Sequence, residues 1–341
     1  MDIDNNQLYA QIADLLIASR QSIVRSVNHT MVMTYFKIGK MVVENEQKGN
    51  ERAAYGKHVL KDISAKLTMQ FGKGFSVENL DRMRFFYKIY GSAISSTLST
   101  KFNLTWSHYL VLMRMENVDE RNFYEIEAAA NSWSLREMKR QINTALYMRL
   151  ALSRDKEGIK QLAEKGHIVE KPVDMLKDPY ILEFLDLKEH YRYSESDLEN
   201  EIIDKLEHFL LELGKGFTFV GRQVRFTFDE KHFKVDLVFF NRLLRCFVVI
   251  DLKLGEMTHQ DLGQMQMYVN YYDRHVKLAD EKPTIGILLC QKKNNAIVEL
   301  TLPQDANIYA SSYSLYLPDK KLLQQKLTEW LSELHDFGNN E

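Results

Sequence analysis

Four apolar runs with strand-like alternation lie in the second half of the chain, and their order constrains the fold more than any other feature. The runs cover residues 217–227, 232–240, 245–254 and 284–290. A helical pattern precedes them at 196–213, and a second helical pattern at 260–276 separates the third run from the fourth. The order helix, three strands, helix, strand is typical of an α/β domain, so we expect a central sheet flanked by helices.

The first half of the chain has a different pattern, with apolar residues at helical spacing almost throughout. Stripes with three-to-four spacing recur from Asn6 to about Leu150. Residues 151–180 are charge-dense and show little periodicity, with two prolines near the end, which is typical of a domain boundary. We therefore expect a helical domain over 1–150, a linker over 151–180 and the α/β domain over 181–341.

Composition excludes several other classes of protein. Of the 341 residues, 45% are hydrophobic, and no apolar run approaches the roughly 18 residues that a membrane span needs. The first residues lack the basic and apolar segments of a signal peptide, so we expect a cytoplasmic protein with no membrane partner. Cys246 and Cys290 each lie inside an apolar strand-like run, which indicates buried thiols rather than zinc ligands or a disulfide.

Residues 61–90 have the outline of a helix-turn-helix, with Ser76 as the N-cap of the second helix. Within residues 52–101, nine basic residues stand against three acidic ones, although the whole chain has a formal net charge of −2. Such an excess is typical of a nucleic-acid-binding surface. In a helix-turn-helix of this kind, the second helix would enter a major groove. A helical hairpin with a solvated charged face explains the residues equally well. The candidate phosphate contacts are Lys73, Arg82, Arg84 and Lys88.

Two of the apolar strands contain charged residues that buried strands rarely tolerate. Side chains alternate along a strand, so Asp251 and Lys253 lie on one face of the run 245–254. In the preceding run, Asp236 lies on the face opposite to its main apolar residues. The loop between the two runs is short enough for a hairpin, which would place Asp236 beside Asp251.

Two carboxylates held close together repel each other unless a cation lies between them. Mg²⁺ (or Mn²⁺) prefers oxygen ligands, so Asp236, Asp251, a backbone carbonyl and a substrate phosphate would suit it. The Lys253 ammonium would orient or deprotonate a water and offset phosphate charge. The alternative is a simple ion pair at the sheet margin, but it would leave one of the two carboxylates uncompensated. These residues together predict metal-assisted phosphodiester hydrolysis.

In chain order, Asp236, the triplet Asp251-Leu252-Lys253 and the helical segment from Gln264 to Tyr268 resemble the motifs of the PD-(D/E)XK nuclease superfamily. Four longer stretches are similar to the bacterial YhcG-type family of these nucleases: "FLLELGKGFTFVGRQ", "KVDLVFFNRLLRCFVVIDLKLGE", "GQMQMYVNYYD" and "PTIGILLCQKKN". The resemblance covers most of the chain and is densest from about residue 183 to 300. It departs from the superfamily pattern at Val235, where the name has proline, and Asp251 is shorter than the more frequent glutamate.

The resemblance implies an all-helical N-terminal domain followed by a restriction-endonuclease-like α/β domain with a mixed central sheet. It also implies that Asp236 and Asp251 bind metal and that Lys253 is the catalytic lysine. Gln264 and Tyr268, one helical turn apart, would contact metal-bound water or phosphate. Helix packing alone explains Tyr268 equally well.

Some members of this superfamily have a glutamate on the helix before the first strand. Glu199 is the candidate, because it lies on the helix side that faces the sheet, whereas Glu201 points to solvent. The residues Ser196 to Glu199 also have the spacing of a capping box, which is an alternative role for Glu199.

We therefore expect a Mg-dependent deoxyribonuclease, with family context suggesting bacterial genome defence, restriction or DNA repair. Cutting both strands with one kind of site usually takes two protomers, so a homodimer is a reasonable expectation, as are partner proteins of a defence system. The alternative is a catalytically silent or partner-dependent nucleic-acid-binding or assembly protein built on a nuclease fold. The intact set Asp236, Asp251 and Lys253 argues against it. The sequence does not decide whether the substrate is DNA or RNA, or whether the enzyme is an endonuclease or an exonuclease.

Overall fold

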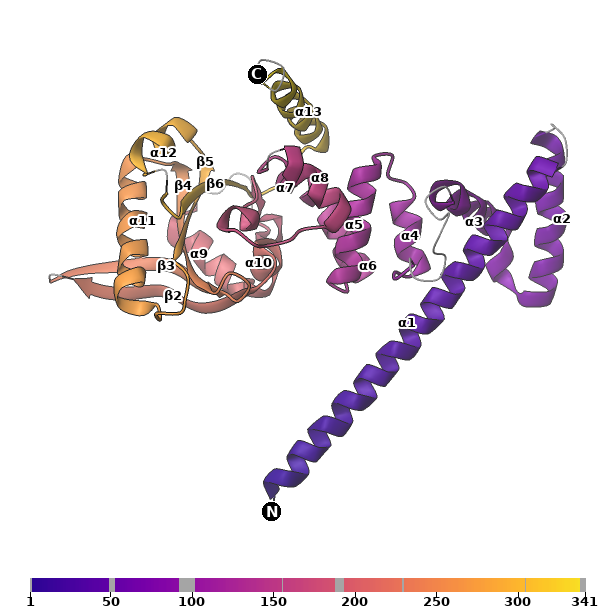
Figure 1. The fold of residues 1–341 in the computed structure, drawn as a ribbon, viewed down its shortest axis with the longest axis horizontal. Coiled ribbons are helices and arrows are strands. Elements are labelled where there is room, and N and C mark those ends of the chain that lie inside the picture. The colour runs from indigo at the N-terminus through magenta and orange to yellow at the C-terminus, as the bar shows by residue number, and fades with distance from the viewer. Residues whose placement is uncertain are drawn as a thin grey trace. The chain divides into compact units, whose positions relative to one another are not determined.

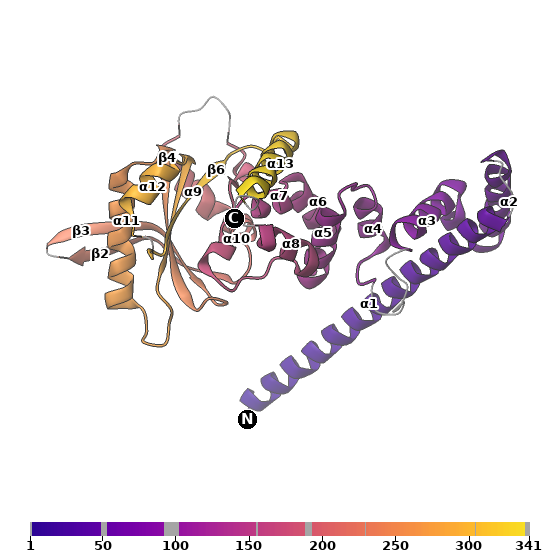
Figure 2. The same ribbon diagram turned by 45° about the horizontal axis from the view of Figure 1, so that its top comes forward.

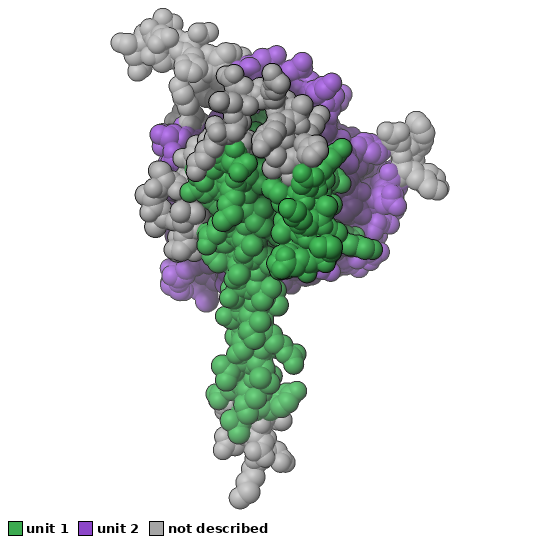
Figure 3. Space-filling view, turned by 90° about the vertical axis from the view of Figure 1, so that its right-hand side faces the viewer, with its two compact units in different colours: residues 1–139 green, residues 140–341 purple. Residues whose placement is uncertain are grey.

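The structure is a computed structural model that describes residues 2–48, 53–91, 102–154, 156–187, 193–228, 230–303 and 305–337. The chain divides into two compact units, residues 1–139 and residues 140–341, coloured green and purple in Figure 3. The division comes earlier than the stretch 151–180 in which the sequence predicted a linker. Much of that stretch is ordered within the second unit, because its helix α8 (Lys156–Lys165) buries Ile159 and Leu162.

The first unit is helical, as the sequence predicted (Figure 1). Its elements are α1 (Asp2–Lys48), α2 (Ala53–Phe71), the 3₁₀ turn η1 (Lys73–Phe75), α3 (Val77–Tyr90), α4 (Trp106–Leu112), α5 (Val118–Ala130) and the start of α6 (Leu135–Asn143). The C-terminal half of α1 packs closely on α3, since a Cβ on Gly39 would lie 2.0 Å from the Met83 carbonyl oxygen. Along the N-terminal half, apolar side chains such as Leu15 and Ile23 are exposed.

Six strands form one mixed sheet in the described part of the second unit, in the order β1-β6-β5-β4-β3-β2. They are β1 (Tyr180–Ile181), β2 (Phe217–Phe228), β3 (Lys231–Asn241), β4 (Cys246–Glu256), β5 (Ile285–Lys292) and β6 (Ile308–Ser314). β2, β3 and β4 pair antiparallel, whereas β4, β5, β6 and β1 pair parallel. The four predicted strands are confirmed as β2 to β5, and β1 and β6 were missed.

Helices cover both faces of this sheet (Figure 1 and Figure 2). On one face, α9 (Glu195–Asp204) and α10 (Leu206–Leu213) pack on the apolar side chains of β3, β4 and β5. On the other face lies α11 (His259–Tyr271), followed by the π-helical turn η4 (Tyr272–Val276) and, after β5, by α12 (Asn295–Thr301). Gly286 permits close packing here, because a Cβ would lie 2.7 Å from the Met265 side chain.

The remaining elements of the second unit are helical. They are α7 (Leu146–Ala151), η2 (Pro172–Met175), η3 (Glu183–Leu185) and α13 (Lys320–Phe337). Among the helices that the structure describes, none has the combination of length and apolar character needed to cross a membrane.

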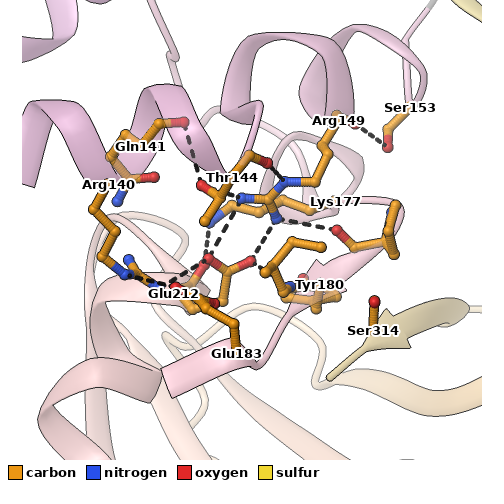
Figure 4. Close-up of polar contacts among 12 residues, drawn as sticks. Arg140, Gln141, Thr144, Arg149, Ser153, Lys177, Tyr180, Glu183, Glu212 and Ser314 are labelled. Carbon is orange, nitrogen blue, oxygen red and sulfur yellow. Dashed lines mark hydrogen bonds and ion pairs between the residues drawn. The ribbon is translucent and has the colours of Figure 1, made fainter. Parts of the chain in front are cut away.

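A fully buried ion pair joins α7 to α10 (Figure 4). Arg149 Nη1 lies 2.5 Å from Glu212 Oε1, and both side chains have no exposed surface. Arg149 also donates to the Thr144 and Pro179 carbonyl oxygens at 2.7 and 3.0 Å, and Ile181 N donates to Glu212 at 3.0 Å. Burial alone would raise the pKa of Glu212, but Arg149 and the other donors hold it below its usual range.

Candidate active site

The candidate site forms where β3 and β4 separate. Their antiparallel pairing, which confirms the predicted hairpin, ends at Leu237 opposite Ile250. One residue beyond, Asp236 and Asp251 occupy facing positions. The Leu252 amide donates to Asp236 Oδ2 at 3.0 Å. A side chain therefore accepts this backbone hydrogen bond, and the carboxylate is held between the diverging strands.

Asp251 is buried with incomplete neutralisation. Its side chain is on the α11 face of the sheet and the residue is 2% exposed. Oδ2 lies 3.1 Å from Lys253 Nζ, but it accepts no hydrogen bond of good geometry from any residue that the structure describes. Burial, and then the charge of Asp236, raise the pKa of Asp251 to about 7 against the opposing effect of Lys253. A further cation at this point would relieve the repulsion.

Lys253 is surrounded by acids. Besides Asp251, its Nζ lies 3.7 Å from Glu195 and 3.9 Å from Asp261, and the Tyr313 hydroxyl donates to its carbonyl oxygen at 3.2 Å. Burial alone would lower the pKa of Lys253, but Asp251, Glu195 and Asp261 together raise it. The side chain is therefore a fixed ammonium at neutral pH, suited to offsetting negative charge rather than accepting a proton.

Sequence reasoning missed Glu195 and Asp261. Both lie in the first turn of a helix: Glu195 directly follows the N-cap Ser194 of α9, and Asp261 is the third residue after the N-cap Thr258 of α11. Glu195 also accepts from the Leu254 amide at 3.3 Å. The spacing from Thr258 to Asp261 is that of a capping box, so the sequence did contain a signal for the helix terminus that Asp261 marks.

The prediction that Ser196 and Glu199 form a capping box is wrong. Ser194 and Asp197 form the box instead, because α9 begins at Glu195. Glu199 is thus not needed as a cap. It is 5% exposed, and its Oε1 accepts no hydrogen bond from the described residues. Burial, followed by the charge of Asp236, raises the pKa of Glu199.

Gln223 links the Glu199 carboxylate to the site. Its side-chain amide donates to Glu199 Oε2 and, at 3.1 Å, to Asp236 Oδ1. No role was predicted for this residue, although it ends the family-like stretch "FLLELGKGFTFVGRQ", because its position beside Asp236 depends on the irregular pairing of β2 with β3.

The predicted pair on α11 lies beside the site. Gln264 donates to the Tyr268 hydroxyl, and that hydroxyl donates to the Lys234 carbonyl oxygen at 2.8 Å. Tyr268 is 1% exposed. It therefore packs α11 on β3 two residues before Asp236, which agrees with the packing alternative for Tyr268. Burial, opposed by the Gln264 hydrogen bond, raises the pKa of Tyr268, with smaller contributions from Asp251 and Asp236.

The donor set fits a hard divalent cation with few protein ligands. Among the residues that the structure describes, no group of three or more histidine, cysteine, aspartate or glutamate side chains is arranged to hold a metal. Asp236 and Asp251 instead form a pair of neighbouring carboxylates, and the raised pKa of Asp251 reflects, after burial, the missing neutralisation. Mg²⁺ commonly binds through one or two carboxylates together with waters and substrate phosphates. The two aspartates could hold such an ion.

The basic residues predicted to contact nucleic acid lie in the first unit. The elements α2, η1 and α3 have the predicted helix-turn-helix outline, and Ser76 caps α3 by accepting from the Asn79 amide at 3.3 Å. Arg82 pairs with Glu78, and Arg84 pairs with Asp81 at 2.6 Å. Lys73 and Lys88 are exposed. Arg52 and Lys101, which contribute to the local charge excess, lie outside the described residues.

In a comparison with known proteins, each half of the chain matches a different protein-family model. A family model described as the YhcG PDDEXK nuclease domain matches residues 173–328, and one described as the DUF1016 N-terminal domain matches residues 11–149. The Escherichia coli (strain K12) protein named "Putative nuclease YhcG" is 39% identical over 359 aligned positions, which cover 97% of this chain and 95% of that protein.

Two solved structures are more distantly similar. A repair endonuclease from Pyrococcus abyssi matches 39% of this chain and 50% of its own, with 17% identity and a TM-score of 0.25. An EndoMS–dsDNA2 complex matches 39% of this chain and 51% of its own, with 15% identity and a TM-score of 0.27.

Proposed function

This chain belongs to the YhcG family of PD-(D/E)XK nucleases, and we propose on that premise that it hydrolyses DNA phosphodiester bonds with Mg²⁺ or Mn²⁺. The family resemblance expected from the motifs is confirmed, and the second unit has the expected restriction-endonuclease-like α/β fold with a mixed sheet. The proposal adds the metal, the substrate and the residues that act.

The single observation that supports it best is the charge arrangement around Asp251. Its buried carboxylate lies beside that of Asp236, and Lys253 alone does not return its pKa to the usual range. A purely structural ion pair would be more fully compensated, because uncompensated buried charge lowers stability. The arrangement is what a site needs when it must attract a divalent cation.

Each residue has a distinct role in this proposal. Asp236 and Asp251 would hold the metal. When bound, it would act as a Lewis acid towards the scissile phosphate and the attacking water. Lys253, kept protonated by its acidic neighbours, offsets the charge that develops on the phosphate oxygens. Gln264 and Tyr268 support the site from α11, and Glu199 approaches Asp236 through Gln223.

In the same proposal, the N-terminal helical unit contributes DNA contacts through Lys73, Arg82, Arg84 and Lys88. Because two of these cations already pair with acids in α3, phosphate would have to compete for them. The family context supports a role in bacterial genome defence, restriction or DNA repair, with a homodimer or defence-system partners as further parts of the proposal.

The test is cleavage of supercoiled plasmid, linear duplex and branched DNA with Mg²⁺, Mn²⁺ or EDTA. We expect metal-dependent cutting that falls by about 10²–10³-fold or more in Lys253→Ala, because a preorganised cation at the phosphate is lost. Lys326→Ala, which removes an exposed lysine from α13, is the matched control and should cut like the wild type.

A Lys253→Ala variant that cuts at the wild-type rate would refute the role of Lys253. Wild-type protein that binds Mn²⁺ and DNA but cuts none of the three substrates would instead favour the partner-dependent alternative.

A further inference from the structure

Gln223 occupies an unusual backbone conformation in β2. Its φ of 49° lies in the left-handed region, which glycine and asparagine adopt far more readily than glutamine. The pairing of β2 with β3 shifts between Phe219 and Gly221, and beyond the shift Arg222 pairs with Leu237 and Val224 with Val235. Gln223 is thereby placed level with Asp236.

The strain coincides with two hydrogen bonds to acids. The same side-chain nitrogen donates to Glu199 Oε2 on α9 and to Asp236 Oδ1 on β3. Strained backbone is commonly found where a side chain must be held in one place for function. A turn or bulge alone does not require glutamine here, since glycine would satisfy the backbone without strain.

The hydrogen bonds fix the orientation of the Asp236 carboxylate. Gln223 donates to Oδ1 and the Leu252 amide donates to Oδ2, at 3.1 and 3.0 Å. Each carboxylate oxygen has two lone pairs, so one on each oxygen is occupied and one stays available for a cation. The donor on Oδ1 is uncharged, and it therefore orients the carboxylate without competing electrostatically with a metal ion.

We propose that Gln223 is a positioning residue that sets the orientation of Asp236 for metal binding and ties Glu199 to it. The proposal rests on the proposed function, because it takes Asp236 as a metal ligand. Groups that orient metal ligands through hydrogen bonds typically change metal affinity by about 10–100-fold when they are removed.

Two substitutions separate the side chain from the backbone strain. Gln223→Gly removes the amide and relieves the left-handed conformation. Gln223→Met removes the amide while keeping a side chain of similar length and the same strain. Gln324→Met, at an exposed position of α13, is the matched control.

The measurement is Mn²⁺ titration of the full-length protein by calorimetry without DNA, together with the melting temperature of each variant in EDTA. We expect both Gln223 variants to bind Mn²⁺ about 10–100-fold more weakly than the wild type. Gln223→Gly should melt at a higher temperature than Gln223→Met, because both variants lack the amide and only methionine keeps the strained backbone, and both should be folded at the titration temperature. The control should bind Mn²⁺ like the wild type.

Wild-type affinity in either Gln223 variant would overturn the positioning role and leave the nuclease proposal standing. Wild-type protein that binds no Mn²⁺ would overturn both, and the two failures are therefore distinguishable. A Gly variant that loses affinity only because its melting temperature falls would also count against the proposal.

Discussion

Glu212 and Asp251 are both buried carboxylates of the second unit, but their surroundings shift their pKa values in opposite directions. Glu212 is matched by Arg149 and by the Ile181 amide, and Lys177 donates to its backbone carbonyl (Figure 4). Asp251 has one lysine at 3.1 Å and a neighbouring carboxylate that repels it. The chain can therefore neutralise a buried acid completely, and at Asp251 it does not.

The difference separates a structural charge from a functional one. At Glu212 the ion pair joins α7 to α10, and nothing more is needed for that role. At Asp251 the remaining charge is available for an added cation, which is the use we propose. Buried charges are costly unless they are paired, so an incompletely paired acid points to a role beyond folding.

The two acids also predict opposite pH dependences. The pKa of Glu212 is lowered in the folded state, so its contribution to stability is present above the unfolded pKa and is lost as pH falls. The pKa of Asp251 is raised, to about 7, so its contribution is present below the unfolded pKa and is lost as pH rises from about 4 to about 7.

The largest expected effect is that of breaking the Glu212 pair. Glu212→Gln leaves Arg149 buried without its counter-charge, and we expect the free energy of unfolding to fall by about 3–5 kcal/mol. Urea unfolding measures it, with Glu207→Gln, an exposed acid on the same helix, as the control. Replacing both partners, with Arg149→Met and Glu212→Leu, should cost less than either single change. A loss below about 1 kcal/mol in Glu212→Gln would remove one side of the comparison.

The opposite sign is expected at Asp251. In EDTA at pH 8, Asp251→Asn should raise the free energy of unfolding by roughly 2–4 kcal/mol, because the neutral amide removes the cost of an ionised buried group. The gain should shrink as the pH is lowered towards 4, where the native carboxyl is already protonated. The same variant should lose DNA cleavage. Urea unfolding curves that show destabilisation at pH 8 would contradict the incomplete pairing of Asp251.

A smaller effect is expected at His167, a buried group that is neutral rather than charged. Burial lowers its pKa to about 3, with Lys177 among the nearby cations that add to the shift. Since the folded pKa lies below the unfolded value, stability is lost as pH falls below about 6.5, by about 2 kcal/mol at pH 5. His167→Gln should show a correspondingly weaker loss between pH 7 and pH 5 in urea unfolding. An unchanged slope would mean that the pKa of His167 is the same in the folded and unfolded protein, and would contradict the lowered value.

The sequence predicted the strands around the site and the hairpin that sets Asp236 opposite Asp251, because alternation and loop length are local properties. It missed β1 and β6, since β1 has only two residues and four of the seven residues of β6 are alanine or serine. The helix predicted as continuous at 196–213 is broken at Lys205, whose Nζ donates to the Leu185 carbonyl oxygen at 2.6 Å.

The surroundings of the catalytic candidates were less predictable than the candidates themselves. Glu195 and Asp261 reach Lys253 only because two helices begin beside β4, and Gln223 reaches Asp236 only because β2 is irregular. Such contacts depend on tertiary structure, which the spacing of residues along the chain does not predict. Alternation along β4 predicts the direction of Asp251. On β3 the alternation breaks next to Asp236, because Phe233 and Val235 pack in the core on the α11 face whereas Leu237 and Phe239 pack in the core on the α9 face.

The hydrogen bond from the Leu252 amide to Asp236 makes one backbone proton a built-in reporter of the site. Its partner is a side-chain oxygen rather than a carbonyl of the neighbouring strand. Hydrogen exchange at Leu252 therefore follows the orientation of that carboxylate and not the sheet ladder alone. Amide exchange, read residue by residue in solution, could follow the loading of this site without any cleavable substrate.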